Sequence, residues 1–169
     1  MNQVIEDFAS HCRQYLKDGP SDAALDKVVA DLQGVLTNEE VYKTYFPPEN
    51  TTERQVIYED KELGFCILAH VNTGAKSSPP HDHGPAWAIY GQVEGQTEMT
   101  EYERAAEPTE DEPGKAKPFK TYMMKPGDAV HYNVGKLHAP ERTDATKLIR
   151  MEGQNMDGVT RDAFVKVLG

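Results

Sequence analysis

Near residue 52 the sequence changes from a helical pattern to a strand pattern. Beyond it the chain consists of short runs that are rich in β-branched and aromatic residues and are separated by Gly, Pro, Asn and Asp. The runs are RQVIYED (54–60), LGFCILAHVN (63–72), AWAIYGQVEGQTEMTEYER (86–104), KPFKTYMMKPGDAV (117–130) and HYNVGKLHAPERTDATKLIRMEG (131–153). Regularly spaced short strands with turn signals are typical of an all-β sandwich or barrel. We therefore expect a mainly β fold.

The residues before this point are expected to be helical. Apolar side chains recur at helical spacing over residues 3–17 and again over residues 22–36. Ser21 or Asp22 is a plausible N-cap for the second helix. The sequence FPPEN (46–50) should end the helical part, because a residue before proline is disfavoured in a helix.

The length and these patterns suit one structural domain. Residues 1–50 should form a helical segment packed on a β-barrel of residues 51–169. The stretch ERAAEPTEDEPGKAK (103–117) has no apolar period and is expected to form an exposed loop or hairpin tip. The C-terminal stretch GVTRDAFVKVLG (158–169) is expected to form a short closing helix.

The net charge restricts the partners. The 169 residues carry a formal net charge of −10, so the chain is repelled by nucleic-acid phosphates and anionic membranes. No run of about 18 apolar residues is present, and the first residues lack an apolar signal core. The two cysteines lie far apart in sequence, which fits a reducing compartment. We expect a cytoplasmic monomer or homodimer whose partner is a small molecule or another protein.

Two histidines lie one residue apart in SSPPHDHGPAWAIYG (77–91). On an extended strand His81 and His83 would point to the same face. Two buried imidazoles are costly unless their ring nitrogens have partners, and a metal ion is such a partner. His138, in PGDAVHYNVGKLHAPERT (126–143), is the best candidate for a third ligand, arriving from a neighbouring strand. Three neutral imidazoles would leave positions open on a divalent metal for water, substrate or dioxygen.

Other residues near these motifs allow two interpretations. An H-x-H pair alone is a weak signal, and the distant P-G-D…G-x-x-H strengthens it. His131 could line the cavity as an acid–base or supporting residue. Trp87 shares the parity of the two histidines and either walls the pocket or packs in the core, and Tyr90 on the same strand is equally open. His70, at the end of a strand, is expected to be structural.

The two histidine motifs resemble those of a known superfamily. GAKSSPPHDHGPAWAIYGQVEG (74–95) is similar to the first cupin motif, and residues 126–143 are similar to the second. Within the cupins, GFCILAHVNTGAKSSPPHDHG (64–84) resembles the thiol dioxygenases of cysteine dioxygenase type, as do the two helices before the barrel. The resemblance implies a jelly-roll barrel, the cupin double-stranded β-helix.

The same resemblance implies that His81, His83 and His138 bind Fe(II), and other divalent metals such as Ni, Zn or Mn suit the same ligands. Most cupins have a glutamate five residues after the second histidine. Thiol dioxygenases lack it, and here the position is Ala88.

Three further residues of this sequence fall at or near positions that serve the substrate in that family. An arginine on an early strand holds the substrate carboxylate, and Arg54 falls near its position, although an exposed arginine beside Glu53 is an equal alternative. The family's Ser-His-Tyr relay is absent. In KLIRMEGQ (147–154), Arg150 stands at the histidine and Glu152 at the tyrosine. Both should share one face, where Glu152 could be a fourth ligand, a general base or a partner of Arg150.

The expected function is therefore a metal-dependent dioxygenase, with Fe(II), that oxidises a small thiol to a sulfinate with dioxygen. The alternative is a metal-binding cupin with another role: a non-thiol dioxygenase, a lyase, an isomerase or a non-catalytic binder. The absent relay tyrosine favours the alternative, whereas Ala88, Arg54 and the N-terminal helices favour the thiol dioxygenase.

Overall fold

The computed structural model describes residues 2–168, and the strands are preceded by helices α1 (Gln3–Leu16), α2 (Asp22–Leu36) and α3 (Glu39–Tyr45). The side chain of Asn2 accepts hydrogen bonds at the start of α1, and that of Ser21 accepts from the Ala24 N–H at the start of α2. The two predicted helices and the Ser21 cap are confirmed. None of the described helices is long and apolar enough to cross a membrane.

The short helix α3 was not expected as a separate element. The side chain of Asn38 caps it by accepting from the Val41 N–H at 3.1 Å. Glu39 and Glu40 lie in its first turn, where negative charge is favourable. An asparagine followed by two acidic residues was the signal in the sequence.

Within the described residues ten strands form two sheets. They are β1 (Gln55–Glu59), β2 (Cys66–Asn72), β3 (Lys76–Ser77), β4 (Ala88–Glu94), β5 (Thr97–Ala106), β6 (Gly114–Met124), β7 (Ala129–Tyr132), β8 (Leu137–Arg142), β9 (Thr146–Glu152) and β10 (Phe164–Lys166). One sheet has the order β1-β2-β9-β4-β7, and the other has the order β10-β6-β5-β8-β3. Early strands pair with late ones, as β2 does with β9, and this makes the fold the predicted jelly-roll barrel with N-terminal helices.

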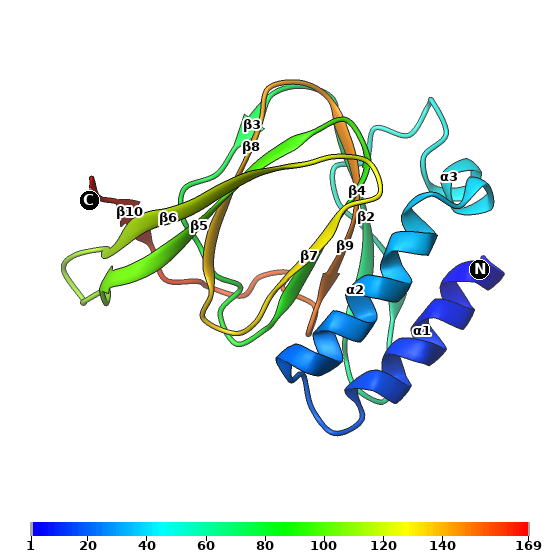
Figure 1. Cartoon of the computed structure of the whole chain (residues 1–169), viewed down its shortest axis with the longest axis horizontal. Coiled ribbons are helices and arrows are strands. Elements are labelled where there is room, and N and C mark those ends of the chain that lie inside the picture. The colour runs from blue at the N-terminus through cyan, green and yellow to red at the C-terminus, as the bar shows by residue number, and fades with distance from the viewer. Residues whose placement is uncertain (1, 169) are drawn as a thin grey trace.

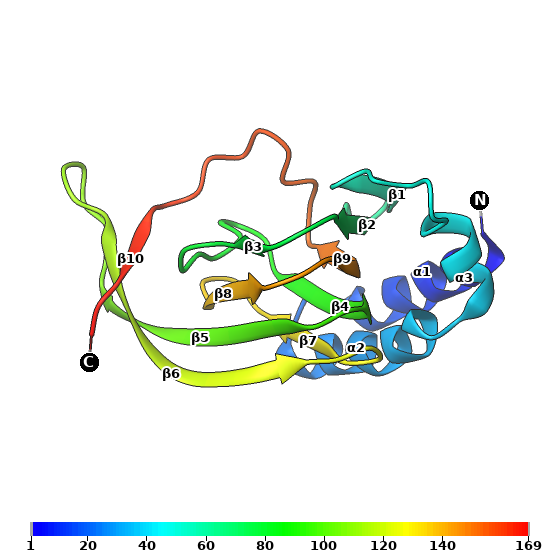
Figure 2. The same cartoon turned by 90° about the horizontal axis from the view of Figure 1, so that it is seen from above.

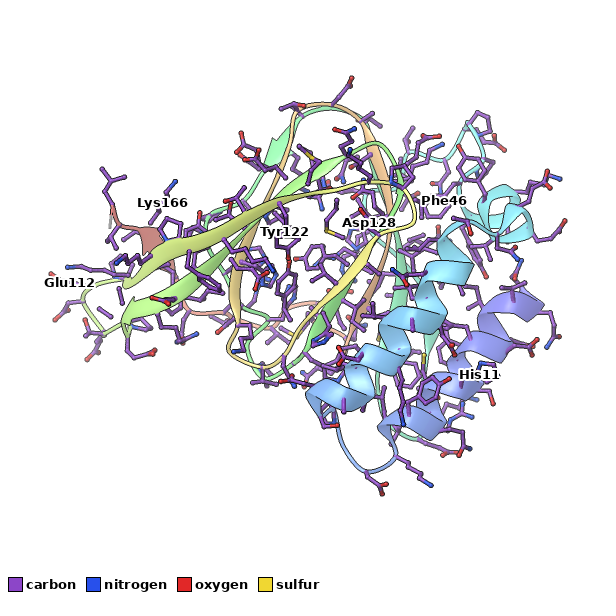
Figure 3. The ribbon with its side chains drawn as sticks, in the orientation of Figure 1. His11, Phe46, Glu112, Tyr122, Asp128 and Lys166 are labelled. Atoms are coloured by element: carbon purple, nitrogen blue, oxygen red, sulfur yellow. The ribbon has the colours of Figure 1, made fainter. Side chains whose placement is uncertain are left out.

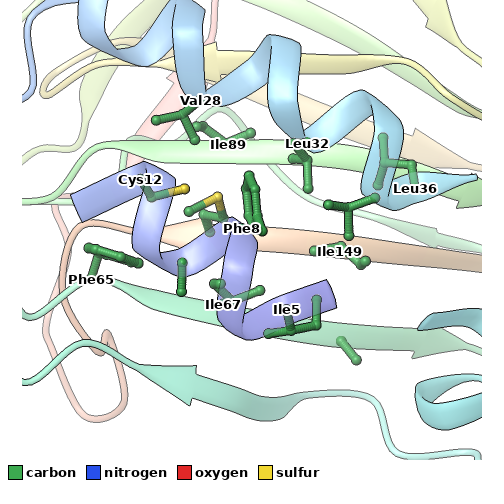
Figure 4. Close-up of a cluster of buried hydrophobic side chains, with 14 of the residues drawn as sticks. Ile5, Phe8, Cys12, Val28, Leu32, Leu36, Phe65, Ile67, Ile89 and Ile149 are labelled. Atoms are coloured by element: carbon green, nitrogen blue, oxygen red, sulfur yellow. The ribbon is translucent and has the colours of Figure 1, made fainter. Parts of the chain in front are cut away.

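The helices cover one face of the sheet β1-β2-β9-β4-β7. Figures 1 and 2 show α1 and α2 on that side, with the long β5–β6 hairpin curving away from them. Ile67, Ile89 and Ile149, from three adjacent strands, are fully buried against the helices (Figure 4). Alternate residues on the same strands point into the barrel, where Tyr90 and Leu148 belong to a second apolar cluster.

Two expectations for the ends of strands need correction. The predicted closing helix is wrong: β10 pairs in parallel with β6, with Phe164 opposite Gly114. A Cβ on Gly114 would lie 2.4 Å from the Phe164 ring, so only a glycine leaves room for the ring at this position. The packed ring holds the C-terminal segment against β6 as a strand. The exposed tip is also shorter than expected, because β5 continues to Ala106 and β6 begins at Gly114.

Candidate metal centre

The structure brings the three predicted histidines together. His81 and His83 lie between β3 and β4, and His138 lies on β8. The backbone N–H groups of His81 and His138 each donate to the other residue's carbonyl at 3.0 Å, which locks the two segments side by side. One ring nitrogen from each histidine lies within 4.8 Å of the other two.

The ring orientations present free lone pairs at one point. The Nδ1 atoms of His81 and His138 lie 2.9 Å and 3.1 Å from the backbone carbonyl oxygens of Pro79 and Lys136. A carbonyl only accepts, so each Nδ1 carries the proton and each Nε2 presents its lone pair. The ring of Tyr132 stacks on that of His138 with centroids 4.0 Å apart and braces it, and the Tyr132 hydroxyl hydrogen-bonds that of Tyr122.

The three imidazoles are held neutral, which is the form that binds a metal. Burial lowers the pKa of His81 to about 4. Burial also lowers the pKa of His83 and of His138 well below the usual value. At neutral pH all three ring systems are therefore available as ligands.

The spacing of His83 and His138 fits a divalent metal ion. Two ring nitrogens bound at about 2.1 Å, at an octahedral or tetrahedral angle, lie roughly 3.0–3.4 Å apart. The Nε2 atoms of His83 and His138 are 3.2 Å apart. The Nδ1 of His83 has no hydrogen-bond partner. Across residues 2–168, the side chains that could hold a metal as a group are these three histidines alone.

Tyr90 was only an open candidate from the sequence, and it lies at the centre of the site. Its hydroxyl oxygen is 3.1 Å from the Nε2 atoms of His83 and His138 and 3.4 Å from that of His81. Its single proton can be donated to only one of these nitrogens. The phenol therefore borders the position that a bound ion would take, and it can donate a proton there or act as a further ligand.

Trp87 lies on the other face of the sheet, among the residues that contact the helices. The expected parity is broken because the histidine segment is not a regular strand. The Ala86 N–H donates to the His83 carbonyl at 3.1 Å, and Gly84 has φ of +59°. After this turn Tyr90, not Trp87, points into the barrel; of the two interpretations of Trp87, packing in the core is confirmed and walling the pocket is wrong.

His131 also lies away from the cavity. It is on β7 opposite Ile89, on the helix side of the sheet. Its Nε2 is 2.7 Å from Oδ1 of Asp26 on α2. The structure therefore contradicts the expectation that His131 lines the cavity, and its position makes it a link between β7 and α2.

A cavity of about 570 Å³ opens beside His81 and Tyr90, a size that suits a small ligand. Its charged and polar lining includes Glu53, Arg54, His70, Asn72, Lys76, His81, Tyr90, Arg142, Arg150, Glu152, Asp157, Arg161 and Asp162. Arg54, Arg150 and Glu152 were expected there. His70, expected to be structural, lines the cavity with an unpaired Nε2, and Arg142 was missed.

The predicted Arg54 is engaged by acidic side chains. Its Nη2 donates to Oε2 of Glu152 at 2.9 Å, and its Nη1 lies 2.9 Å from Oδ1 of Asp157. The same Oε2 accepts from the Met156 N–H at 3.3 Å. Glu152 is thus a buried partner of Arg54 and does not belong to the metal-binding group.

No family model and no curated protein matches the sequence. Solved structures do match. A cupin superfamily protein from Desulfitobacterium hafniense is 13% identical, with 62% of this chain and 79% of that chain covered and a TM-score of 0.43. The Cnp3 cupin domain from Schizosaccharomyces pombe is 12% identical (60% and 64% covered, TM-score 0.45), and a cupin-2 domain containing protein from Shewanella frigidimarina is 13% identical (71% and 96% covered, TM-score 0.45).

These structural neighbours are cupins. At these identities and scores the likeness says nothing about substrate or reaction. The closer resemblance to thiol dioxygenases stays a prediction from the sequence motifs.

Proposed function

We propose that the protein is a metal-dependent oxygenase that uses Fe(II) and dioxygen to oxidise a small thiol to a sulfinate. The observation that carries the proposal is the convergence of three neutral imidazoles on one point, without a carboxylate in the group. Neutral ligands leave the full positive charge on a divalent ion, and three of them leave coordination positions open. This combination favours an anionic sulfur ligand.

Iron bound by His81, His83 and His138 would supply open positions for a thiolate and dioxygen and would pass the four electrons given up by the sulfur to dioxygen, both of whose oxygen atoms enter the sulfinate. The chain supplies the orientation. The Pro79 and Lys136 carbonyls hold two of the imidazoles by their Nδ1–H groups. A cavity closed around two reactants removes much of the entropic cost of bringing them together.

Tyr90 is proposed to hold the proton that the family's relay tyrosine would hold. The relay strand, β9, carries Arg150 and Glu152 at the relay positions, whereas Tyr90 reaches the histidines from β4. The Tyr90 hydroxyl accepts from Nη2 of Arg150 at 3.3 Å, and the guanidinium lies 4.4 Å from the centre of the phenol ring. These contacts hold the hydroxyl toward the ligands, where it can donate to an oxygen or sulfur atom.

A second candidate is a metal cupin with non-redox chemistry, such as a lyase or isomerase. The phenol of Tyr90 favours it, because an acid–base group next to a Lewis-acidic ion suits proton transfer at carbon. The bound metal separates the two candidates: iron favours oxygen chemistry, whereas zinc or nickel favours the alternative.

The test is oxygen uptake by protein reconstituted anaerobically with Fe(II), with 3-mercaptopropionate, cysteine and cysteamine as thiols. We expect uptake with at least one thiol, together with its sulfinate. His138→Ala should abolish uptake. His11→Ala is the matched control and should keep full uptake, because His11 is an exposed residue of α1 (Figure 3) whose ring contacts Asp31 on α2. Stoichiometric iron without uptake for any thiol would overturn the proposal.

A further inference from the structure

Two arginines in the cavity have no carboxylate within hydrogen-bonding distance. Arg142 is 6% exposed, and its hydrogen bond is from Nε to Oγ1 of Thr97 at 3.0 Å. Across residues 2–168, no carboxylate oxygen lies within 4 Å of its guanidinium nitrogens. A buried cation without an anion is costly, so this position favours a negatively charged ligand.

Arg150 is also only partly satisfied. Its Nε is buried without an acceptor, and its nearest carboxylate oxygen, Oε1 of Glu152, is 3.9 Å away, beyond hydrogen-bonding distance. Glu152 is instead held at 2.9 Å by Arg54. The Arg150 side chain therefore keeps most of its hydrogen-bonding capacity for a ligand.

The two arginines and His70 line the same cavity. Burial, and after it the charges of Arg150, Arg54 and Arg142, lower the pKa of His70 to about 2. Burial and then the proximity of Arg150 lower the pKa of Arg142 to about 10. This part of the cavity therefore holds two cations, with His70 as a neutral ring whose Nε2 is unpaired.

We propose that Arg142 and Arg150 form an anion-binding subsite that takes the carboxylate of the substrate, and that Arg54 does not. A guanidinium pairs with a carboxylate through two parallel hydrogen bonds, which gives both charge and direction. The guanidinium nitrogens of Arg54 are already paired with two acidic residues, Glu152 and Asp157. The statement that the bound carboxylate belongs to the substrate rests on the proposed function. The statement that the two arginines bind an anion does not.

The geometry also limits the length of the ligand. Nη2 of Arg150 and the Nε2 atoms of His83 and His138 all contact one oxygen atom, the Tyr90 hydroxyl. A ligand that reaches both the guanidinium and the metal position must therefore be short. Its carboxylate and its metal-binding atom should lie on neighbouring or next-neighbouring carbons.

The test is a titration of the metal-free protein with propionate. Binding is measured from the changes in the NMR signals of the arginine Nε–H groups and the histidine rings. Propionamide, which has the same shape without the charge, should bind far more weakly. Arg150→Met and Arg142→Met should each weaken propionate binding by about 10- to 100-fold, the worth of a charge-assisted hydrogen-bond pair. Arg150→Lys, which keeps the charge but loses the fork, should lie between.

Lys43→Met is the matched control, because it removes one positive charge at an exposed position on α3. It should leave propionate affinity within about twofold, since an exposed charge on another element is screened. Equal affinity for propionate and propionamide, or unchanged affinity in both arginine variants, would overturn the subsite. Tighter binding of inorganic phosphate than of propionate would overturn the carboxylate assignment in favour of a phosphate-bearing ligand.

This titration is independent of turnover. Propionate binding that depends on both arginines, together with no oxygen uptake by the iron-loaded protein, would refute the proposed function and support the subsite. Equal uptake with cysteamine and 3-mercaptopropionate, with no preference for propionate over propionamide, would support the function and refute the subsite.

Discussion

The two faces of the sheet β1-β2-β9-β4-β7 have opposite chemistry although the same strands build both. On β9, Ile149 points to the helices and Arg150 points into the cavity, and on β4 the same holds for Ile89 and Tyr90. Burying the apolar face stabilises the fold, whereas burying charged and imidazole groups costs free energy unless they find partners. Along each strand, residues that face the helices thus contribute to stability, and the residues between them serve ligand binding. Substitutions of single residues can test this difference.

The largest effect is expected for the metal. His83→Ala removes one of three ligands and should weaken metal binding by more than about 100-fold, since loss of a mere supporting residue already costs 10- to 100-fold. The measurement is metal content after dialysis and a competition titration against a chelator. The metal-free protein should stay folded, because Nδ1 of His83 has no partner to lose, although truncating this buried ring costs some stability. Full metal content in this variant would contradict the site.

The next comparison uses neighbours on β9. Ile149→Ala should lower the free energy of unfolding by about 2–5 kcal/mol, because a fully buried side chain leaves a cavity beneath the helices. Arg150→Met should change it by less than about 1 kcal/mol, since it replaces a buried cation, whose nearest carboxylate oxygen is 3.9 Å away, with an apolar chain. Urea unfolding of the two metal-free variants measures both. A large loss in Arg150→Met would mean that the cavity face carries stability as well.

The third effect is on acid stability. The folded-state pKa of His70 is lowered to about 2 from an ordinary value of 6.5. Between these values the unfolded chain binds a proton that the folded chain does not. Stability is therefore complete above about pH 6.5 and falls as the pH drops, by about 1.4 kcal/mol per pH unit for this group.

His70→Asn should remove that share of the pH dependence. Urea unfolding of the metal-free protein between about pH 6 and pH 4.5 should show a shallower slope for the variant. An unchanged slope would mean that His70 is protonated in the folded protein, and hence that the arginines do not repel its charge.

The sequence predicted what depends on short-range patterns. The helices follow from apolar spacing and the Ser21 cap. The pairing of His81 with His138 follows from two motifs that each carry their own turn residues. The jelly roll follows from strand spacing and from the motif resemblance, because topology is otherwise set by contacts between distant strands.

The errors arose where a local turn or a distant partner decides the outcome. The turn at Gly84 shifts the parity of β4, which exchanges Trp87 for Tyr90 as the residue inside the barrel. Arg142 follows His138 by four residues on one strand, so strand alternation could have predicted that both face the barrel interior. That Arg142 has no carboxylate partner could not be predicted, because this depends on every element around the cavity. For the same reason the partnership of Arg54 with Glu152, 98 positions apart, could not be predicted.

The smallest predicted effect distinguishes two roles for Arg54. In the structure it holds Glu152 at 2.9 Å, while Arg150 is 3.9 Å from the other oxygen of that carboxylate. Arg54→Gln should release Glu152 toward Arg150, where it competes with an incoming anion and weakens propionate binding by roughly three- to tenfold. The double variant Arg54→Gln/Glu152→Gln should recover affinity, because the competing charge is gone. If Arg54 itself binds the anion, the single variant loses as much as Arg150→Met and the second substitution restores nothing, so the recovery decides whether Arg54 is a positioning residue or a ligand-binding one.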